Sequence, residues 1–388
     1  MKLIKEYRYY IICCLMVFIH TGINSVATAL MPQLKIYYGV QLSEIITGAA
    51  ACSLTMFIGG FIGAKFIKKV KPKGAFAVAS ICAGLYAFFI LITNKLWGFY
   101  LGCGLVGFTA CWGSYATSII YINKYYEKKS AILISSLITV GFFGSAFFQF
   151  CCGLFLQYIG LKGIYFSLII IALFALLINY LFLSNIEAIE KNEEVKSTVD
   201  ISFYKSHTFI KMSIVTLFGG TLCATFGTLC TTFFQSHDIS TTLSTTYLSF
   251  YTLSCGLLAL IGGLVVDKFG YKIYVIYLFG AYGIAISSAL IFDNMELMFI
   301  IPFMIFFFGL ASSIGSIYNL LSKPVFKEKF LTANTKLLSI GSFGSAILLP
   351  TYTKIYEYFG FTTLWIILFI VSIICFALLI SIINEKKI

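Results

Sequence analysis

Charged residues divide this chain into long apolar runs. Cutting it at every Asp, Glu, Lys and Arg leaves twelve stretches of 17 residues or more. They cover residues 9–34, 45–64, 74–94, 96–123, 130–161, 163–186, 212–237, 239–266, 273–292, 297–322, 337–353 and 358–384. A helix of about 20 apolar residues crosses a hydrocarbon core of about 30 Å and satisfies its own backbone hydrogen bonds. The pattern therefore predicts twelve transmembrane helices.

Composition excludes a water-soluble fold. The chain is 60% hydrophobic and 11% charged, whereas soluble proteins are about 25% charged. Its mean hydropathy of +0.96 points the same way. We expect an all-α integral membrane protein. Its first stretch, 9–34, is too long for a cleaved signal peptide.

The distribution of basic residues orients the predicted helices. With the N-terminus inside, the inner segments carry 23 Lys and Arg residues and the outer ones carry four. Basic loops stay in the cytoplasm, so both termini are predicted to be cytoplasmic in a multi-pass protein of the plasma membrane. The net charge of +12 is explained by basic residues that orient the protein and lie near anionic headgroups. Nucleic acid is therefore not an expected partner.

The twelve cysteines show no metal-ligand spacing with the three histidines. Buried Cys behaves as a small apolar residue, so we expect no metal and no cofactor. No grouping of nucleophile, base and orienting residue occurs, which argues against an enzyme.

An internal repeat divides the chain. The run 141–146 (GFFGSA) recurs 200 residues later at 341–346 (GSFGSA), and the Tyr-x-Gly of 158–160 recurs at 358–360. The chain is thus predicted to form two pseudo-symmetric six-helix halves, 1–186 and 209–388, joined by the polar cytoplasmic linker 187–208. Parallel halves of this kind are a transporter architecture with a substrate site near the midplane of the membrane.

One motif identifies a family. Gly263, Asp267, Lys268, Gly270 and Lys272 fit G-x-x-x-D-[RK]-x-G-x-[RK] in a predicted cytoplasmic loop. The chain therefore resembles the major facilitator superfamily over its full length. The resemblance implies alternating access and a loop that locks one conformation.

A weaker copy of this motif is expected in the first half, at 60–69. Gly60 and Lys65 match the pattern, while Ala64 and Ile67 stand where the family has Asp and the second Gly.

A narrower resemblance concerns the oxalate/formate antiporter and monocarboxylate transporter branch. Residues 113–115, 124–131, 141–144 and 326–338 are similar to runs of that branch. The resemblance implies a small organic anion as solute. An intramembrane Lys and an Arg are associated with carboxylate binding there, but Ser342 aligns with the Lys, and the only arginine of this chain is Arg8.

His20 is the only ionisable side chain predicted at mid-depth in the membrane, which makes it a candidate for proton or anion binding. Asn24 and Thr28 share its helix face at a spacing of four residues. The alternative is a neutral histidine that hydrogen bonds to a neighbouring helix.

Other polar side chains form a candidate lining of the solute pathway. Thr221, Thr225, Thr228, Thr232 and Gln235 make a continuous stripe at helical spacing. The further candidates are Trp112, Tyr115, Gln149, Tyr251, Ser316, Asn319 and Ser342. The alternatives are helix packing for the hydroxyls, core packing for the aromatic rings and a structural hydrogen bond for the amide.

These features predict a secondary transporter that carries a small solute by alternating access. The favoured solute is a small organic anion, a monocarboxylate or dicarboxylate, moved by antiport, facilitated diffusion or proton-linked transport. A neutral or amphipathic solute, including drug efflux, is the alternative, and a transporter-like receptor without transport is another. The expected partners are the solute and the bilayer, with a monomeric chain.

Overall fold

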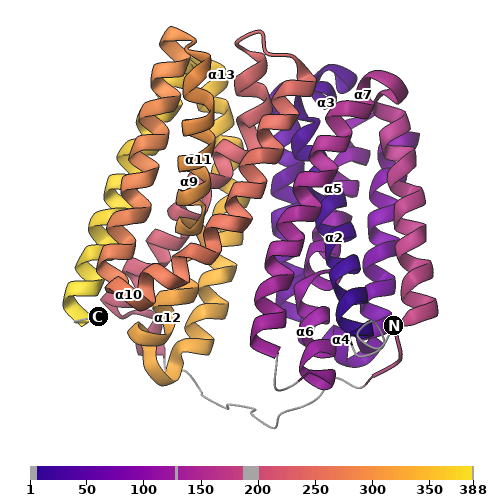
Figure 1. Ribbon diagram of the computed structural model, residues 1–388, viewed down its shortest axis with the longest axis horizontal. Coiled ribbons are helices and arrows are strands. Elements are labelled where there is room, and N and C mark those ends of the chain that lie inside the picture. Colours follow the sequence, from indigo (N-terminus) through magenta and orange to yellow (C-terminus); the bar gives the residue numbers. More distant parts are fainter. Residues whose placement is uncertain (1–6, 127–129, 187–200, 387–388) are drawn as a thin grey trace. The chain divides into compact units, whose positions relative to one another are not determined.

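The computed structural model describes residues 7–126, 130–186 and 201–386, and every regular element in these ranges is helical (Figure 1). The first half contains α2 (Arg8–Ala29), α3 (Met31–Tyr38), α4 (Leu42–Ile92), α5 (Leu96–Trp112), α6 (Tyr115–Tyr125) and α7 (Ser130–Phe182). The remaining elements are α8 (Ile201–Tyr204), α9 (His207–Gln235), α10 (Thr241–Met295), η2 (Met298–Ile300), α11 (Ile301–Ala311), η3 (Ser312–Ser316), α12 (Ile317–Phe326), η4 (Lys327–Lys329) and α13 (Phe330–Lys386).

Four of the helices contain an internal break. The backbone leaves the helical conformation at Lys71 in α4, Gly160 in α7, Gly270 in α10 and Gly360 in α13, each with a positive φ between 63° and 80°. Without its break, the 53-residue α7 would be about 80 Å long, more than twice the thickness of a hydrocarbon core. Figure 1 shows α7 reversing its direction. Each break therefore separates two segments of membrane length.

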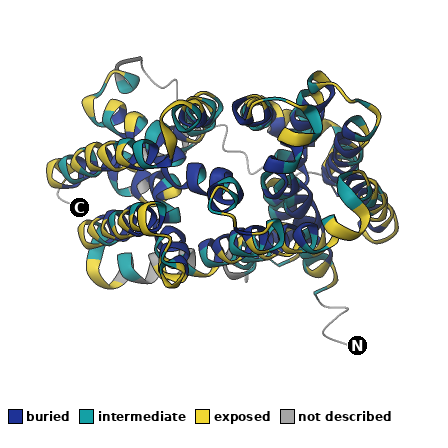
Figure 2. Cartoon of the chain, turned by 90° about the horizontal axis from the view of Figure 1, so that it is seen from above, coloured by how far each residue is buried: buried dark blue, intermediate teal, exposed yellow. Residues whose placement is uncertain are grey.

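The helices present apolar side chains outward. Phe166, Ile170 and Leu177 in α7 are each more than half exposed. Figure 2 shows the buried faces of the helices turned toward the interior of each bundle and the exposed faces turned outward. In the described part of the chain, nine helical segments are long and apolar enough to cross a membrane. The predicted all-α membrane fold is confirmed, while the count of twelve spans stays a prediction.

Contacts divide the chain into two compact units. Unit 1 comprises Met1–Glu193 and Ser240–Thr252, and unit 2 comprises Glu194–Ile239 and Leu253–Ile388. The break between Glu193 and Glu194 falls inside the predicted linker 187–208, of which residues 187–200 lie outside the described part. The first turns of α10 group with unit 1, whereas the repeat assigned them to the second half. The predicted division at 186 and 209 stays a prediction.

In unit 1, a glycine lets α7 pack closely on α2. A Cβ atom at Gly144 would lie 2.3 Å from the carbonyl oxygen of Phe18. Hydroxyl groups bond across the same contact: Thr21 Oγ1 donates to the carbonyl of Gly141 at 2.9 Å, and Ser25 Oγ donates to the carbonyl of Ser145 at 3.1 Å. Small residues and such hydrogen bonds are the usual means of holding helices together in lipid.

In unit 2, α13 packs on α9 in the same manner. A Cβ atom at Gly344 would lie 2.6 Å from the carbonyl oxygen of Leu217, and one at Gly341 would lie 3.3 Å from Thr216 Cγ2. The repeated G-x-x-G-S-A run therefore marks an equivalent helix contact in the two halves.

Candidate functional site

His20 lies inside unit 1, where α2, α4 and α5 meet. Its side chain is fully buried. Nδ1 lies 2.5 Å from the carbonyl oxygen of Gly113, and Nε2 lies 3.0 Å from Oγ of Ser80. Because a carbonyl can only accept, Nδ1 carries the proton. The Ser80 hydroxyl, whose single proton can go either to Nε2 of the neutral ring or to the carbonyl oxygen of Phe76 at 3.0 Å, completes the contact. Both ring nitrogens are thus engaged within the bundle, the arrangement expected of a structural histidine. Its role in transport stays a prediction.

The rest of the His20 face is less enclosed. Asn24 and Thr28 are half-buried. The amide oxygen of Asn24 accepts a hydrogen bond from the Cys52 thiol at 3.7 Å. The spacing of four residues places the three side chains on one side of α2. The neighbouring helices bury His20 completely but leave Asn24 and Thr28 half-buried.

Trp112 belongs to the core of unit 1. Its side chain is 6% exposed and packs between Phe66 and Phe108, with ring centroids 4.0 and 4.7 Å away. The indole Nε1 donates to the carbonyl of Gly59 at 3.1 Å. Packing and hydrogen bonding therefore account for this residue without a solute.

Tyr115 and Gln149 join helices within unit 1. Tyr115 is half-buried, and its hydroxyl lies 2.0 Å from where a Cβ atom of Gly141 would be. Gln149 is 4% exposed, and its amide oxygen accepts a hydrogen bond from Thr252 Oγ1 at 2.8 Å. The buried amide of Gln149 thus ties α7 to the part of α10 that belongs to unit 1.

The threonine stripe of α9 faces the interior of unit 2. Thr221, Thr225 and Thr228 are at most 9% exposed. Thr221 donates to the carbonyl of Phe218, and Thr225 donates to the carbonyl of Thr221, both at 2.7 Å. Threonines that bond their own helix backbone suit helix packing. Thr232 continues the stripe with a buried hydroxyl that has no partner.

The remaining candidates differ widely in exposure. Tyr251 is 7% exposed, Ser342 is half-buried, and Ser316 and Asn319 are exposed. Ser316 and Ser342 donate to carbonyls of their own helical turns, at 3.3 and 3.2 Å. Exposed polar side chains on a lipid-facing surface would be costly. A role of Ser316 and Asn319 in solute binding stays a prediction.

The second-half signature loop shows why its glycine matters. Gly270 lies at the break of α10 with φ 80° and ψ 171°, a backbone conformation open essentially to glycine only. Lys268 and Lys272 flank the break and are exposed. Gly263 and the side chain of Asp267 lie outside the described part, so the predicted lock through Asp267 is untested.

The structure corrects the predicted alignment of the first-half copy of the signature loop. The starts of α4 and α10, Leu42 and Thr241, are 199 residues apart, and their breaks at Lys71 and Gly270 are also 199 apart. Segment 64–73 therefore corresponds to 263–272, and the predicted alignment of 60–69 is wrong by four residues.

With the corrected register, Gly60 and Lys65 lose the motif positions assigned to them. Lys68 takes the place of Asp267, and Lys71 takes the place of Gly270. Identical residues favoured the alignment of 60–69, but the helix breaks at Lys71. Pro72 then starts the next helical segment, and the first turn of a helix is the position that proline prefers.

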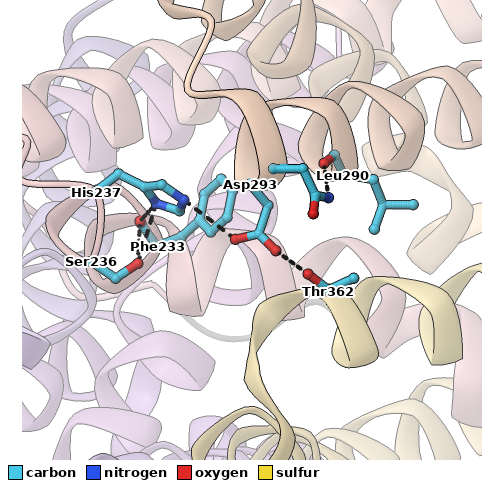
Figure 3. Close-up of polar contacts among 7 residues, drawn as sticks. Phe233, Ser236, His237, Leu290, Asp293 and Thr362 are labelled. Atoms are coloured by element: carbon cyan, nitrogen blue, oxygen red, sulfur yellow. Dashed lines mark hydrogen bonds and ion pairs between the residues drawn. The ribbon is translucent and has the colours of Figure 1, made fainter.

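A polar contact that the sequence did not predict joins three helices of unit 2 (Figure 3). His237 follows α9, Asp293 lies near the end of α10, and Thr362 follows the break in α13. His237 Nε2 lies 3.3 Å from Asp293 Oδ1, and the Thr362 hydroxyl donates to Asp293 Oδ2 at 2.5 Å.

The surroundings of this contact exclude most water. The His237 and Asp293 side chains are 8% and 12% exposed, and Nδ1 of His237 donates to the carbonyl of Phe233 at 2.8 Å. The rings of Phe233 and Phe292 pack against the imidazole, with centroids 5.1 and 4.9 Å away. In the sequence, His237 was only the last residue of the apolar run 212–237, and Asp293 only marked the end of the run 273–292. An acid and a histidine that both end predicted helices on the outer side were the available signal.

Comparisons with known proteins agree on the fold. The family model described as Major Facilitator Superfamily matches residues 13–249, more than half of the chain. Among curated protein sequences, none is significantly similar to this chain.

Solved structures of transporters match over nearly the whole length. A mutant of the nucleoside transporter NupG has a TM-score of 0.82 and 14% identity, covering 96% of this chain and 99% of that chain. The D-xylose-proton symporter has a TM-score of 0.74 and 14% identity, covering 96% of each chain. Another structure of NupG has a TM-score of 0.74 and 13% identity, covering 99% of each chain. At these identities the likeness concerns the fold.

Proposed function

The chain belongs to the major facilitator superfamily and is a multi-pass secondary transporter, and we propose that its solute is a small, uncharged molecule rich in hydroxyl groups. One observation carries the proposal. His20, the titratable member of the candidate set, has both ring nitrogens bonded inside unit 1, and the other candidates are uncharged. Hydroxyl and amide groups such as those of Asn24, Thr28, Ser316 and Asn319 can exchange hydrogen bonds with a polar solute.

Energetics favour a neutral solute over an ion. An anion that enters a low-dielectric site without a positive partner loses its hydration without compensation, whereas a hydroxyl needs only a hydrogen bond. Two of the similar structures are named for nucleoside and D-xylose transport, and nucleosides and D-xylose are uncharged molecules that carry several hydroxyl groups. This proposal therefore takes up the neutral alternative in place of the organic anion favoured by the sequence.

A small monocarboxylate or dicarboxylate is the second candidate. The resemblance of residues 113–115 and 124–131 to the oxalate/formate and monocarboxylate transporter branch supports it. For such a solute, His20 would have to exchange its bonds with Gly113 and Ser80 for a bond to the carboxylate.

Uptake into proteoliposomes tests both candidates. Purified protein is reconstituted and offered labelled uridine, D-xylose, lactate or oxalate, each with and without an imposed pH gradient. We expect saturable uptake of a neutral solute and no uptake of the two acids above that of empty liposomes. Saturable transport of an acid alone would replace this proposal with the second candidate. Dependence on the pH gradient would distinguish proton-linked transport from facilitated diffusion.

We also propose that the chain crosses the membrane twelve times with both termini in the cytoplasm. Nine described segments have membrane length and composition. Dividing Ser136–Phe182 at Gly160 and Lys336–Lys386 at Gly360 adds two, and the part of α10 before Gly270 adds the twelfth. The excess of basic residues in the inner segments supports the orientation. Impermeant thiol labelling of cysteines introduced at Lys69 and Lys162 should find only Lys162 accessible from outside.

The two halves within one chain support a monomer as the transporting species. Light scattering of the purified protein in detergent, corrected for bound detergent, tests this with an expected protein mass of 43.2 kDa.

A further inference from the structure

A groove of about 710 Å³ opens on unit 1 between α7 and the segment of α4 that follows Lys71. Ala77, Leu173 and Leu177 make part of its lining apolar, and Lys73, Asn179 and Asn185 make part of it polar. At about 1.5 Å of rise per residue, Leu173 lies about 9 Å along its helix from Asn179. The lining of the groove thus changes from apolar to polar along α7, in the way that a phospholipid changes from acyl chain to headgroup.

The polar part holds a positive charge beside an unused acceptor. Lys73 Nζ donates to the carbonyl of Tyr180 at 2.9 Å and lies 5.2 Å from the centroid of the Tyr180 ring. A lysine ammonium has three donors, so this bond leaves it able to bind an anion. Asn179 Nδ2 donates to the carbonyl of Lys73 at 3.0 Å, while Oδ1 of this 1% exposed residue accepts no hydrogen bond. Such a buried acceptor calls for a donor.

The charge on the α4 side of the groove favours an anionic ligand. Lys65, Lys68, Lys69 and Lys71 precede Lys73, and no acidic residue occurs from 45 to 94. Arg8 donates to the carbonyl of Phe182, at the same end of α7, at 3.2 Å. Basic clusters at the cytoplasmic ends of membrane helices attract anionic lipids.

Comparison of the two halves of the internal repeat shows which residues of this groove the shared helix packing requires. With the offsets of 199 and 200 residues, Lys73 corresponds to Lys272, while Asn179 and Tyr180 correspond to Leu379 and Ile380. The second half keeps the lysine but places apolar residues where the first half has the amide and the phenol. The polar part of the groove is therefore an addition to the first half that the shared helix packing does not require.

We propose that this groove binds an anionic phospholipid whose headgroup carries hydroxyl groups, such as phosphatidylglycerol. An acyl chain lies along Leu173 and Leu177, the phosphate meets the ammonium of Lys73, and a headgroup hydroxyl donates to Asn179 Oδ1. The inference depends on the membrane location of the chain and is independent of the identity of the transported solute.

Native mass spectrometry of the full chain in detergent tests the proposal by titration with phosphatidylglycerol or phosphatidylcholine. We expect tighter binding of phosphatidylglycerol. Lys73→Gln should weaken it about fivefold or more, the equivalent of about one lysine contact at a membrane surface. Lys73→Arg should keep it, because the guanidinium also binds phosphate. Glycerol phosphate without acyl chains should not compete, which distinguishes a lipid from a free phosphate.

Two further variants complete the test. Lys69→Gln removes the same charge from an exposed neighbour outside the groove and should weaken the binding by less than Lys73→Gln does. Asn179→Leu copies the second half and should reduce the preference for phosphatidylglycerol over phosphatidylcholine. Equal binding of the two lipids to the native chain would overturn the proposal. So would unchanged binding in Lys73→Gln, or an equal loss in Lys69→Gln, each in protein that elutes as a single species.

Discussion

His237 and Asp293 are 56 positions apart in the chain, yet Nε2 of one lies 3.3 Å from Oδ1 of the other. Thr362 binds the second oxygen of the same carboxylate. The contact thereby joins the ends of α9, α10 and the second segment of α13 within unit 2. Polar groups of this kind, mostly withdrawn from water, stabilise a bundle as long as all partners remain.

Asp293→Ala should destabilise unit 2. The change leaves His237 Nε2 and the Thr362 hydroxyl without their partner, and an unpaired buried polar group costs about 1–3 kcal/mol. A thermal shift of the purified protein in detergent measures the loss. Asp238→Asn is the control, because Asp238 is exposed and asparagine tolerates its positive φ of 58°. Equal melting temperatures for Asp293→Ala and the native chain would refute a stabilising role.

Gly144→Ala should force α7 away from α2. The new Cβ atom would lie 2.3 Å from the carbonyl oxygen of Phe18, and backbone cannot move aside cheaply. Overpacking of this sort costs about 1–3 kcal/mol, measured as a lower melting temperature. Gly280→Ala provides the matched control, since nothing lies within 4 Å of a Cβ atom there. An alanine tolerated equally at both positions would show that close helix contact at Gly144 is not required.

Lys71→Gly should raise stability. Lys71 adopts φ 63° and ψ 159°, which costs a residue with a side chain about 1–3 kcal/mol and which glycine adopts freely. Lys71→Ala removes the same charge but keeps the strain, so its melting temperature should equal that of the native chain. The expectation fails if alanine and glycine raise the melting temperature equally, because the charge rather than the backbone would then be responsible.

His20→Gln and Ser80→Ala separate structure from transport. Both should lower the melting temperature, Ser80→Ala by the loss of one hydrogen bond, worth about 1 kcal/mol. If His20 only joins helices, uptake per folded molecule should keep the pH profile of the native chain in both variants. A changed pH profile in His20→Gln alone would instead make His20 part of the transport mechanism.

The helical membrane fold could be predicted from the sequence because charge is expensive in lipid. Charged side chains therefore end the apolar runs. The run 141–146 and its copy at 341–346 each mark a helix contact. The structure places helix breaks at Gly160 and Gly360, within the repeated Tyr-x-Gly of 158–160 and 358–360, and glycine adopts their positive φ without strain.

The sequence could predict less about the site, since periodicity shows which residues share a helix face but not what that face meets. Trp112 and Thr225 are polar or amphipathic, as a solute pathway requires, yet they pack inside their own units. His20 at mid-depth met the criterion for a functional residue, and the structure encloses it between Gly113 and Ser80.

The sequence by itself determined the solvent, the helices and the internal repeat, because hydropathy and charge act locally along the chain. Only the tertiary structure decided that Lys71 rather than Ile67 corresponds to Gly270, and that His237 meets Asp293. Both depend on where distant segments come together in space, and hydrogen bonds form between atoms about 3 Å apart whatever their separation in the chain.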